Sequence, residues 1–412
     1  MVETIQWTNA LSTRPSLEAA VQEVVNQVQS SISGSLDLGI VFISSAFESE
    51  YSRLMPLLQE KLAVPILIGC SGGGIVGMTD GDAKEIEAKV ALSLSVGQLP
   101  DVAIQPFLIE PNTLPDLDSP PQQWVDLIGV SPEAQPDFIV LADPMAGGLN
   151  DFLQGMDFAY PGATKVGGLA SSGTMSARTC VFYQDEAYFG DIVGIALSGN
   201  IKLDTIVAQG CRPIGPVYRV TEGERNVILE LQEADGEEAN ADPLPPLKAL
   251  QNMLETLNDE DREKIQNSLF VGMAQSEFKI TLEPGDFLIR QPMGIDPRVG
   301  ALAIGDRVRP GQRIQFHLRD AQTSADDLNI LLKRYQLEQS GSTSSPVGAL
   351  MFACLGRGRS LYEAADFDSG LFTQTIPNIP ISGFFCNGEI GPVGGTSFIH
   401  GFTSVFGILR QP

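Results

Sequence analysis

Three short segments of the sequence place hydroxyl, thiol, amide or carboxylate side chains beside glycine. Cys70 and Cys386 take corresponding places in the first and third segments. Glycine lets a ligand approach the backbone closely, and exposed backbone N–H groups bind carboxylate or phosphate oxygens. We therefore predict that these turns, at 69–74, 167–173 and 383–391, and a fourth turn at 355–358 converge on one small polar ligand. Packing of small residues at tight turns is the alternative interpretation. The predicted ligand-binding residues are Gly69, Cys70, Ser71, Gly72, Gly168, Ser171, Arg357, Cys386, Asn387 and Glu389.

Two charged residues of this set could recognise opposite ends of a zwitterion. Arg357 follows an apolar stretch, and a guanidinium there could hold a carboxylate through two hydrogen bonds. Glu389 lies between glycines and could hold an ammonium group. Arg357 could equally pair with one of the 51 acidic residues, and Glu389 could cap a turn. One shared site and one site in each domain both remain open.

The first glycine segment also matches two patterns of known chemistry. Residues 69–73 fit the G-x-S-x-G pattern of a serine nucleophile elbow, and residues 72–77 fit the G-x-G-x-x-G pattern of a dinucleotide-binding loop. Both patterns need a helix directly after the turn, and the consecutive glycines at 72–74 disfavour one. The chain has 2 histidines, which leaves few bases for a triad. We therefore predict no enzyme activity, no catalytic residue and no cofactor, and a thiol- or serine-based hydrolase is the alternative.

The glycine turns follow strand–helix–strand units that recur three times. Each unit has an apolar run, a stretch with helical spacing and a second apolar run that leads into glycine. Because open α/β sheets bind ligands at the carboxyl ends of their strands, this order favours a site at the turns. Internal duplication and chance similarity both explain the recurrence. The paired runs are 39–43 with 65–69, 138–141 with 164–168, and 349–352 with 379–383.

Stretches that alternate polar and apolar residues lie between these units and predict further strands, so a purely parallel sheet is excluded. We predict an α/β fold of two layered domains with mixed sheets and packed helices, and with possible internal repeats of the strand–helix–strand–glycine unit. The predicted domains are residues 1–218 and 219–412, and the shift in composition allows a boundary anywhere from 215 to 245. Residues 233–246 are acidic and contain three prolines, so we expect a solvated loop.

The charge of the chain limits its partners. Its 412 residues carry a formal net charge of −25, which argues against nucleic acid and against anionic membrane surfaces as partners. The longest apolar runs are far shorter than a membrane span, and the N-terminus shows no secretory signal. The five cysteines are widely spaced and form no C-x-x-C pair. We therefore predict reduced thiols, no metal site and a cytoplasmic location.

The segments around the turns resemble a known family. GIVFISS at 39–45, LIGCSGGG at 67–74 and VGGLASSG at 166–173 are similar to the N-terminal part of the FIST family, whose name stands for F-box and intracellular signal transduction. GALMFACLGRG at 348–358 and ISGFFCNGEIGPVGG at 381–395 are similar to its C-terminal part. The resemblance therefore implies one N-terminal and one C-terminal FIST domain.

This resemblance covers roughly residues 35–400. It implies domains that are proposed to sense small ligands such as amino acids and that many relatives fuse to signalling modules. The chain leaves no room for such a module, so a separate signalling protein would be the partner. We predict a cytosolic protein that binds an amino acid or a similar small polar metabolite. A protein–protein adaptor that uses residues 233–246 without a ligand is the alternative, and the ligand, the output partner and the oligomeric state stay open.

Overall fold

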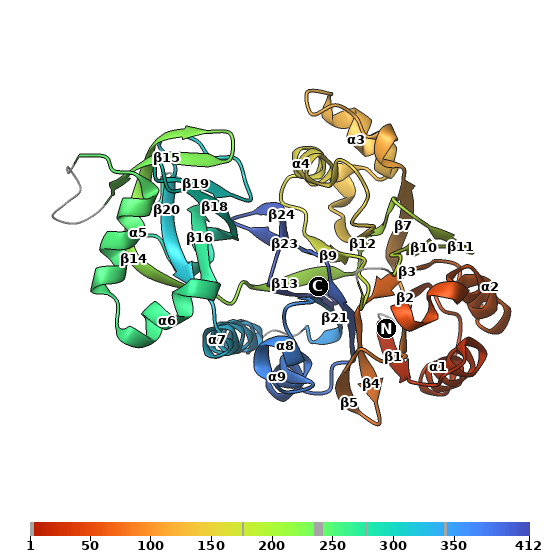
Figure 1. The fold of residues 1–412 in the computed structure, drawn as a ribbon. Coiled ribbons are helices and arrows are strands. Elements are labelled where there is room, and N and C mark those ends of the chain that lie inside the picture. The colour runs from red at the N-terminus through yellow and green to blue at the C-terminus, as the bar shows by residue number, and fades with distance from the viewer. Residues whose placement is uncertain (1–3, 175–176, 235–241, 277, 342–343) are drawn as a thin grey trace. The chain divides into compact units, whose positions relative to one another are not determined.

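The fold is mixed α/β, as predicted. In the computed structural model, the described strands form three sheets of six strands and one of seven, and helices pack on them (Figure 1). Of the predicted loop at 233–246, residues 235–241 lie outside the described part of the chain. The described residues are 4–174, 177–234, 242–276, 278–341 and 344–412.

The chain divides into two compact units. Unit 1 consists of residues 1–208 and 328–412, and unit 2 consists of residues 209–327. The boundaries of these units differ from those of the predicted sequence domains 1–218 and 219–412. The reason is that residues 328–412 belong to the same unit as residues 1–208. The sequence-based division itself stays a prediction.

Unit 1 contains three repeats built on one order of elements: strand, helix, strand, helix and then four strands. The third repeat differs in having two short helices, at 359–362 and 367–375, in the place of the second helix. The first repeat comprises β1 (Gln6–Ser12), α1 (Leu17–Ser31), β2 (Leu38–Ser44), α2 (Tyr51–Lys61), β3 (Leu67–Gly72), β4 (Gly74–Thr79), β5 (Asp82–Glu87) and β6 (Leu92–Gln98). The second comprises β7 (Val102–Ile109), α3 (Pro121–Ile128), β8 (Asp137–Ala142), α4 (Leu149–Ala159), β9 (Lys165–Leu169), β10 (Val181–Tyr183), β11 (Glu186–Tyr188) and β12 (Ile192–Gly199).

The third repeat is interrupted by unit 2, which follows its first strand. It comprises β13 (Lys202–Ala208), α7 (Ala321–Gln339), β21 (Pro346–Cys354), α8 (Arg359–Tyr362), α9 (Phe367–Thr375), β22 (Ile381–Cys386), β23 (Glu389–Val393), β24 (Thr396–His400) and β25 (Ser404–Arg410). The three strand–helix–strand units predicted from the sequence are thus the centres of three structural repeats.

The three sheets of unit 1 pair their strands in the same way. In each repeat the last strand pairs antiparallel with the first and second strands, and the second strand pairs parallel with the third. The strand orders are β1-β6-β2-β3-β10-β11, β24-β23-β9-β8-β12-β7 and β13-β25-β21-β22-β4-β5. The sequence recurrence therefore reflects a repeated topology.

The fourth and fifth strands of each repeat form a hairpin that joins the sheet of a different repeat. Strand β4 of the first repeat pairs with β22 of the third, β23 of the third pairs with β9 of the second, and β10 of the second pairs with β3 of the first. The exchange is cyclic, so each sheet is completed by a hairpin from another repeat.

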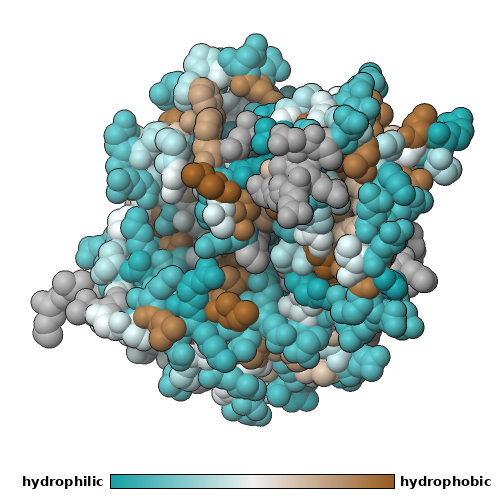
Figure 2. All heavy atoms as spheres, turned by 90° about the vertical axis from the view of Figure 1, so that its left-hand side faces the viewer, coloured by the Kyte–Doolittle hydropathy of each residue, from teal (hydrophilic) through white to brown (hydrophobic). Residues whose placement is uncertain are grey.

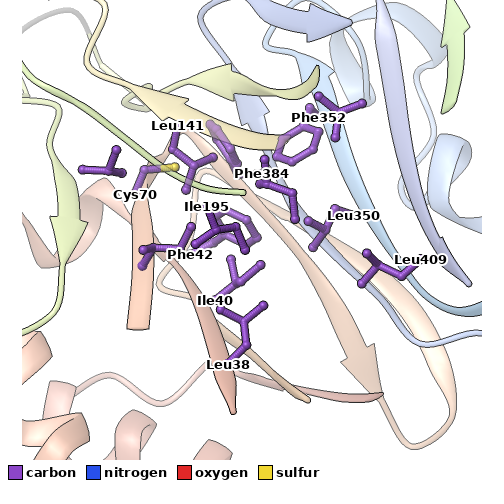
Figure 3. Close-up of a cluster of buried hydrophobic side chains, with 14 of the residues drawn as sticks. Leu38, Ile40, Phe42, Cys70, Leu141, Ile195, Leu350, Phe352, Phe384 and Leu409 are labelled. Carbon is purple, nitrogen blue, oxygen red and sulfur yellow. The ribbon is translucent and has the colours of Figure 1, made fainter. Parts of the chain in front are cut away.

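One hydrophobic core draws its side chains from the inner faces of all three sheets. The rings of Phe42 on β2, Phe352 on β21 and Phe384 on β22 contact one another, with centroids 5.1 to 6.5 Å apart. Leu141 on β8 and Ile195 on β12 belong to the same cluster (Figure 3). Burial of these large apolar side chains stabilises the association of the repeats.

The outer face of each sheet packs against helices of its own repeat. Helix α1 shows the sequence reason, because Leu17, Val21, Val24 and Val28 recur at helical spacing and all four are buried. Ser16 caps this helix by accepting a hydrogen bond from the backbone N–H of the third residue of the helix, at 3.3 Å. Separate outer clusters cover the other two sheets in the same manner.

Each parallel strand pair contains a glycine at a position where a side chain would collide with the neighbouring strand. The pairs are Gly69 with Val41, Gly167 with Val140, and Gly383 with Met351. A Cβ atom on any of the three glycines would lie 1.7 to 2.0 Å from the carbonyl oxygen of its partner. Glycine at these positions therefore permits the close approach of the two strands.

The same register corrects one sequence comparison. Because Gly69 matches Gly383, the residue that corresponds to Cys70 in the third repeat is Phe384, not Cys386. The two cysteines therefore occupy different positions on their strands.

Unit 2 is built on one antiparallel sheet of seven described strands, whose bounds are given at the end of this paragraph. The strand order is β17-β16-β20-β14-β15-β19-β18. Its core contains Val220, Phe316 and neighbouring apolar residues. His317 is buried beside them, and burial lowers the pKa of its imidazole to about 4, so this ring is neutral at pH 7. The elements are β14 (Arg212–Glu224), β15 (Val227–Glu233), α5 (Pro246–Thr256), α6 (Asp259–Ser268), β16 (Leu269–Ala274), β17 (Phe287–Arg290), β18 (Pro292–Asp296), β19 (Ala301–Ile304) and β20 (Arg313–Leu318).

The face shown in Figure 2 is largely hydrophilic, and hydrophobic residues occur on it in small groups. Among the described helices, none is long and apolar enough to cross a membrane.

The strand contact at Gly383 predicts the effect of a small substitution. Gly383→Ala should lower the free energy of unfolding by about 3 kcal/mol or more, the upper end of overpacking effects, because the new Cβ would lie 1.8 Å from the carbonyl oxygen of Met351. Gly370→Ala in α9 is the matched control, because its added Cβ would meet no atom within 4 Å apart from its chain neighbours and the backbone of its own helix. Urea denaturation of the full chain measures both. Equal midpoints for the two variants would contradict the close contact.

Candidate functional site

The strand ends of the three repeats meet at one place in unit 1. The N–H of Ser171, just after β9, donates to the carbonyl oxygen of Ser71 in β3 at 3.1 Å. The hydroxyl of Ser171 accepts from the N–H of Gly73 at 2.8 Å and donates to the carbonyl oxygen of Phe385 in β22. One serine thus links three repeats. We call residues 71–73, 169–173 and 385–388 the strand-end junction.

Backbone hydrogen bonds extend the strand-end junction to the predicted turn at 355–358. The N–H of Asn387 donates to the carbonyl oxygen of Leu169 at 3.0 Å, and the N–H of Leu169 donates to the carbonyl oxygen of Gly388 at 2.8 Å. The N–H of Leu355 donates to the carbonyl oxygen of Cys386 at 3.0 Å. The structure therefore brings the four predicted glycine turns together.

The hydroxyl and thiol groups of the strand-end junction are engaged inside the protein. The Ser71 hydroxyl donates to the carbonyl oxygen of Ser171 at 3.2 Å and accepts from the N–H of Cys180 at 3.1 Å. Cys70 and Cys386 are fully buried, and burial raises the pKa of both thiols well above the ordinary value. These groups stabilise the meeting of the strands, and the geometry exposes none of them as a nucleophile.

The sequence patterns of an elbow and a dinucleotide loop do not form those structures. Ser71 lies within strand β3, and strand β4 begins at Gly74. No helix N-terminus follows the glycines, so the backbone lacks the phosphate-binding geometry that both patterns require.

Arg357 is buried and holds a carboxylate of the protein itself. Its Nε and Nη2 atoms lie 2.6 and 3.0 Å from the two carboxylate oxygens of Asp368, and Nη2 also donates to the hydroxyl of Tyr362 at 2.6 Å. This is the bidentate geometry expected from the sequence, with an internal partner in place of a ligand. The geometry therefore does not favour the predicted role of Arg357 in binding a ligand carboxylate.

Glu389 is equally enclosed. It is the first residue of β23, where it pairs across the sheet with Gly168, and its Oε2 accepts the backbone N–H of Thr403 at 3.1 Å. The side chain is fully buried. The predicted role of Glu389 in binding a ligand ammonium is not favoured either, because the fold itself surrounds this carboxylate.

A second buried acid lies beside the Arg357–Asp368 pair. Glu85 on β5 accepts the N–H of Ser369 at 2.8 Å through Oε1, and its own N–H donates to Asp366 at 2.6 Å. Burial, and then the charge of Asp368, raise the pKa of Glu85 to about 7. The exchanged hairpin β4–β5 therefore meets the third repeat through a carboxylate that is half protonated near neutral pH.

A hollow of about 710 Å³ opens beside the strand-end junction. It is the space in which a ligand could contact the predicted turns, because Asn387, Ser172, Gly173 and Leu355 line it. Of the predicted site residues, Asn387 lines this space, and the others are buried and do not line it. Those buried residues are Gly69, Cys70, Ser71, Gly72, Gly168, Ser171, Arg357, Cys386 and Glu389.

Two charged groups of opposite sign line the same hollow. Asp143, just after β8, is 2% exposed, and its carboxylate accepts the N–H of Met145 at 2.8 Å and the hydroxyl of Thr179 at 3.1 Å. Arg178 is exposed, and its guanidinium carbon lies 4.2 Å from the centre of the Phe189 ring. Within the described ranges no carboxylate forms an ion pair with Arg178.

The sequence analysis missed these two residues for different reasons. Asp143 follows the predicted strand 138–141 within the turn Asp-Pro-Met, so a polar residue at a strand end was a usable signal. Arg178 and Phe189 flank the exchanged hairpin β10–β11, and no local pattern predicts which sheet this hairpin joins.

The described residues contain no group of three histidine, cysteine, aspartate or glutamate side chains that could hold a metal ion. The five cysteines are all free thiols.

The class of protein that these observations define is a mixed α/β protein built from three repeats, with a hollow beside the ends of its strands. The model of the FIST N domain matches residues 37–234, and the model of the FIST C domain matches residues 247–392. The chain therefore belongs to the FIST family, as the sequence resemblance predicted. FIST domains are generally sensory domains of signal transduction and are thought to bind small ligands.

Similar proteins occur in bacteria and plants. An uncharacterized protein of Mycobacterium tuberculosis is 30% identical over 395 residues, which cover 96% of this chain and 97% of the relative. An uncharacterized protein of Mycobacterium bovis is 28% identical over 393 residues, 95% of each chain. An F-box/LRR-repeat protein of Arabidopsis thaliana is 28% identical over 123 residues, 26% of this chain and 23% of the plant protein.

The raised pKa of Glu85 predicts how stability changes with pH. Below about pH 4.5 this carboxyl is protonated in the folded and unfolded states alike, and between pH 4.5 and 7 the unfolded state loses its proton first. The free energy of unfolding therefore falls as the pH rises from about 4.5 to 7, and the full cost of the buried charge is present above pH 7. Glu85→Gln should raise the free energy of unfolding by roughly 1–3 kcal/mol at pH 8 and have little effect at pH 4.5.

Urea denaturation of the full chain at several pH values measures this difference. Glu133→Gln, which removes an exposed carboxylate, is the control and should show no such pH dependence. A Glu85→Gln effect that is the same at pH 4.5 and pH 8 would contradict the buried, partly protonated carboxyl.

Proposed function

We propose that this protein is a sensory protein that binds a small polar ligand in the hollow beside the strand-end junction. The observation that carries the proposal is the pair of opposite charges on its walls, Asp143 and Arg178. The guanidinium of Arg178 stacks on Phe189 and forms no ion pair with a described carboxylate, in a chain where acidic residues outnumber basic ones 51 to 26. A basic group left available in so acidic a protein is suited to a ligand anion.

The ligand class that fits both charges is an amino acid or a similar zwitterion. Arg178 would hold the carboxylate, and Asp143 together with the exposed side chain of Asn387 would hold the ammonium group. Phe189 is 46% exposed and offers an apolar wall to the rest of the ligand. This assignment keeps the expected zwitterion and replaces the two residues first expected to bind it.

The chemistry of these side chains favours ligand binding over catalysis as the function of the site. The hydroxyls of Ser71 and Ser171 are used in hydrogen bonds between strands, and the thiols of Cys70 and Cys386 are buried with raised pKa values. The Nε2 atom of His400 lies 3.0 Å from the carbonyl oxygen of Gly391 and is buried, so it is poorly placed as a base.

We further propose that the protein acts in the cytoplasm and that a separate signalling protein reads the bound state. Five free thiols suit a reducing compartment. The similarity of part of the chain to a plant F-box protein supports a signalling context.

Calorimetric titration of the full chain with each common amino acid tests the proposal. At least one should bind, and Arg178→Gln and Asp143→Asn should each weaken that binding by about 1.5–3 kcal/mol, the value of a charge-assisted hydrogen bond. Asp143→Asn preserves shape, so the N–H of Met145 still has an acceptor.

Arg307→Gln, which removes an exposed arginine of unit 2, is the matched control and should leave the affinity unchanged. Unchanged affinity in both pocket variants would place the site elsewhere, and the absence of binding by every amino acid would refute the proposed ligand class.

A further inference from the structure

A second hollow of about 390 Å³ adjoins the proposed site. The two hollows share Met145 and Gly190 among their lining residues, so they are neighbours on the surface. The second hollow extends from the Asp143 end of the site toward the loop that follows β7.

The walls of this second hollow are acidic and aromatic. Glu110 and Asp191 contribute carboxylates, and Tyr188 contributes a half-buried ring. Asp191 is next to Asp143, because its carbonyl oxygen accepts the N–H of Asp143 at 2.9 Å. An aromatic face beside carboxylates is the combination that recognises organic cations.

The three carboxylates repel one another. Burial is the main cause that raises the pKa of Asp191, and the charges of Glu110 and Asp143 raise it further. None of the three forms an ion pair with a lysine or arginine in the part of the chain that the structure describes. A bound cation would relieve this repulsion.

The geometry argues for an organic cation in preference to a metal ion. Within the described residues, the carboxylates do not form a cluster that could hold a metal. An ammonium or guanidinium group needs no such convergence, because several donors on one cation can reach carboxylates that lie apart.

We propose that the second hollow receives a positively charged group of the ligand, so that the ligand is a basic amino acid or a close analogue. This inference rests on the proposed function, because the carboxylate and ammonium end of the same ligand occupies the first hollow. Arg178 binds the carboxylate, Asp143 binds the first ammonium, and Glu110 and Asp191 bind the second cationic group.

The test compares probes that differ in one charge. L-Arginine is titrated against L-citrulline, which has nearly the same shape and no side-chain charge, and L-lysine is titrated against L-norleucine. The proposal expects each basic probe to bind at least about tenfold more tightly than its neutral partner. Glu110→Gln and Asp191→Asn should each bring the arginine-to-citrulline preference close to one, and Glu133→Gln should preserve it.

The outcomes separate this inference from the proposed function. If arginine and citrulline bind equally well, the second hollow does not recognise charge, while the proposed amino-acid site stands. A preference for arginine that survives both Glu110→Gln and Asp191→Asn would place the cation elsewhere and overturn the inference. If no amino acid binds, the proposed function fails and this inference fails with it.

Discussion

The close contact between the second and third strands of each repeat is the constraint on which unit 1 depends. Gly69, Gly167 and Gly383 face carbonyl oxygens at distances that leave no space for a side chain. Each of these glycines lies two residues before the segment of the strand-end junction that follows it in the sequence. The loops that line the proposed site follow directly on these strands, so their positions depend on how closely the strands pack.

The exchanged hairpins concentrate polar contacts where repeats meet. Glu85 on β5 reaches Ser369 of the third repeat, and Glu389 on β23 lies beside Gly168 of the second. The inner core between the sheets is apolar by contrast. We interpret these buried carboxylates as a means of specifying which hairpin joins which sheet, since apolar contacts alone would tolerate a wrong pairing. The proposed site lies beside such a boundary, where β10–β11 brings Phe189 to the strand ends.

Local patterns in the sequence predicted the parts of the fold that local patterns determine. Hydrophobic periodicity located the parallel strands and the helices between them. The glycine turns were expected to meet because ligands in open α/β sheets bind at the carboxyl ends of the strands. Local patterns could not predict which residues pair in the folded chain. The sequence left open whether Arg357 binds a ligand or pairs with an acidic residue, and no local pattern indicated that Asp368, 11 residues later, is its partner. Arg178 carried no signal at all, because its place in the site depends on which sheet its hairpin joins.

The cyclic exchange of hairpins has a consequence for biosynthesis. The hairpin β4–β5 ends at residue 87, but its pairing partner β22 spans residues 381–386 and is synthesised much later. During translation the hairpin of the first repeat therefore lacks the sheet of the third repeat that it joins. The edge strand β3 also stays unpaired on one side until β10 is synthesised. Such waiting edges are templates for pairing with other chains, and contacts of such large sequence separation form slowly. A nascent or truncated chain of this protein is thus expected to depend on chaperones until its last repeat closes the ring of sheets.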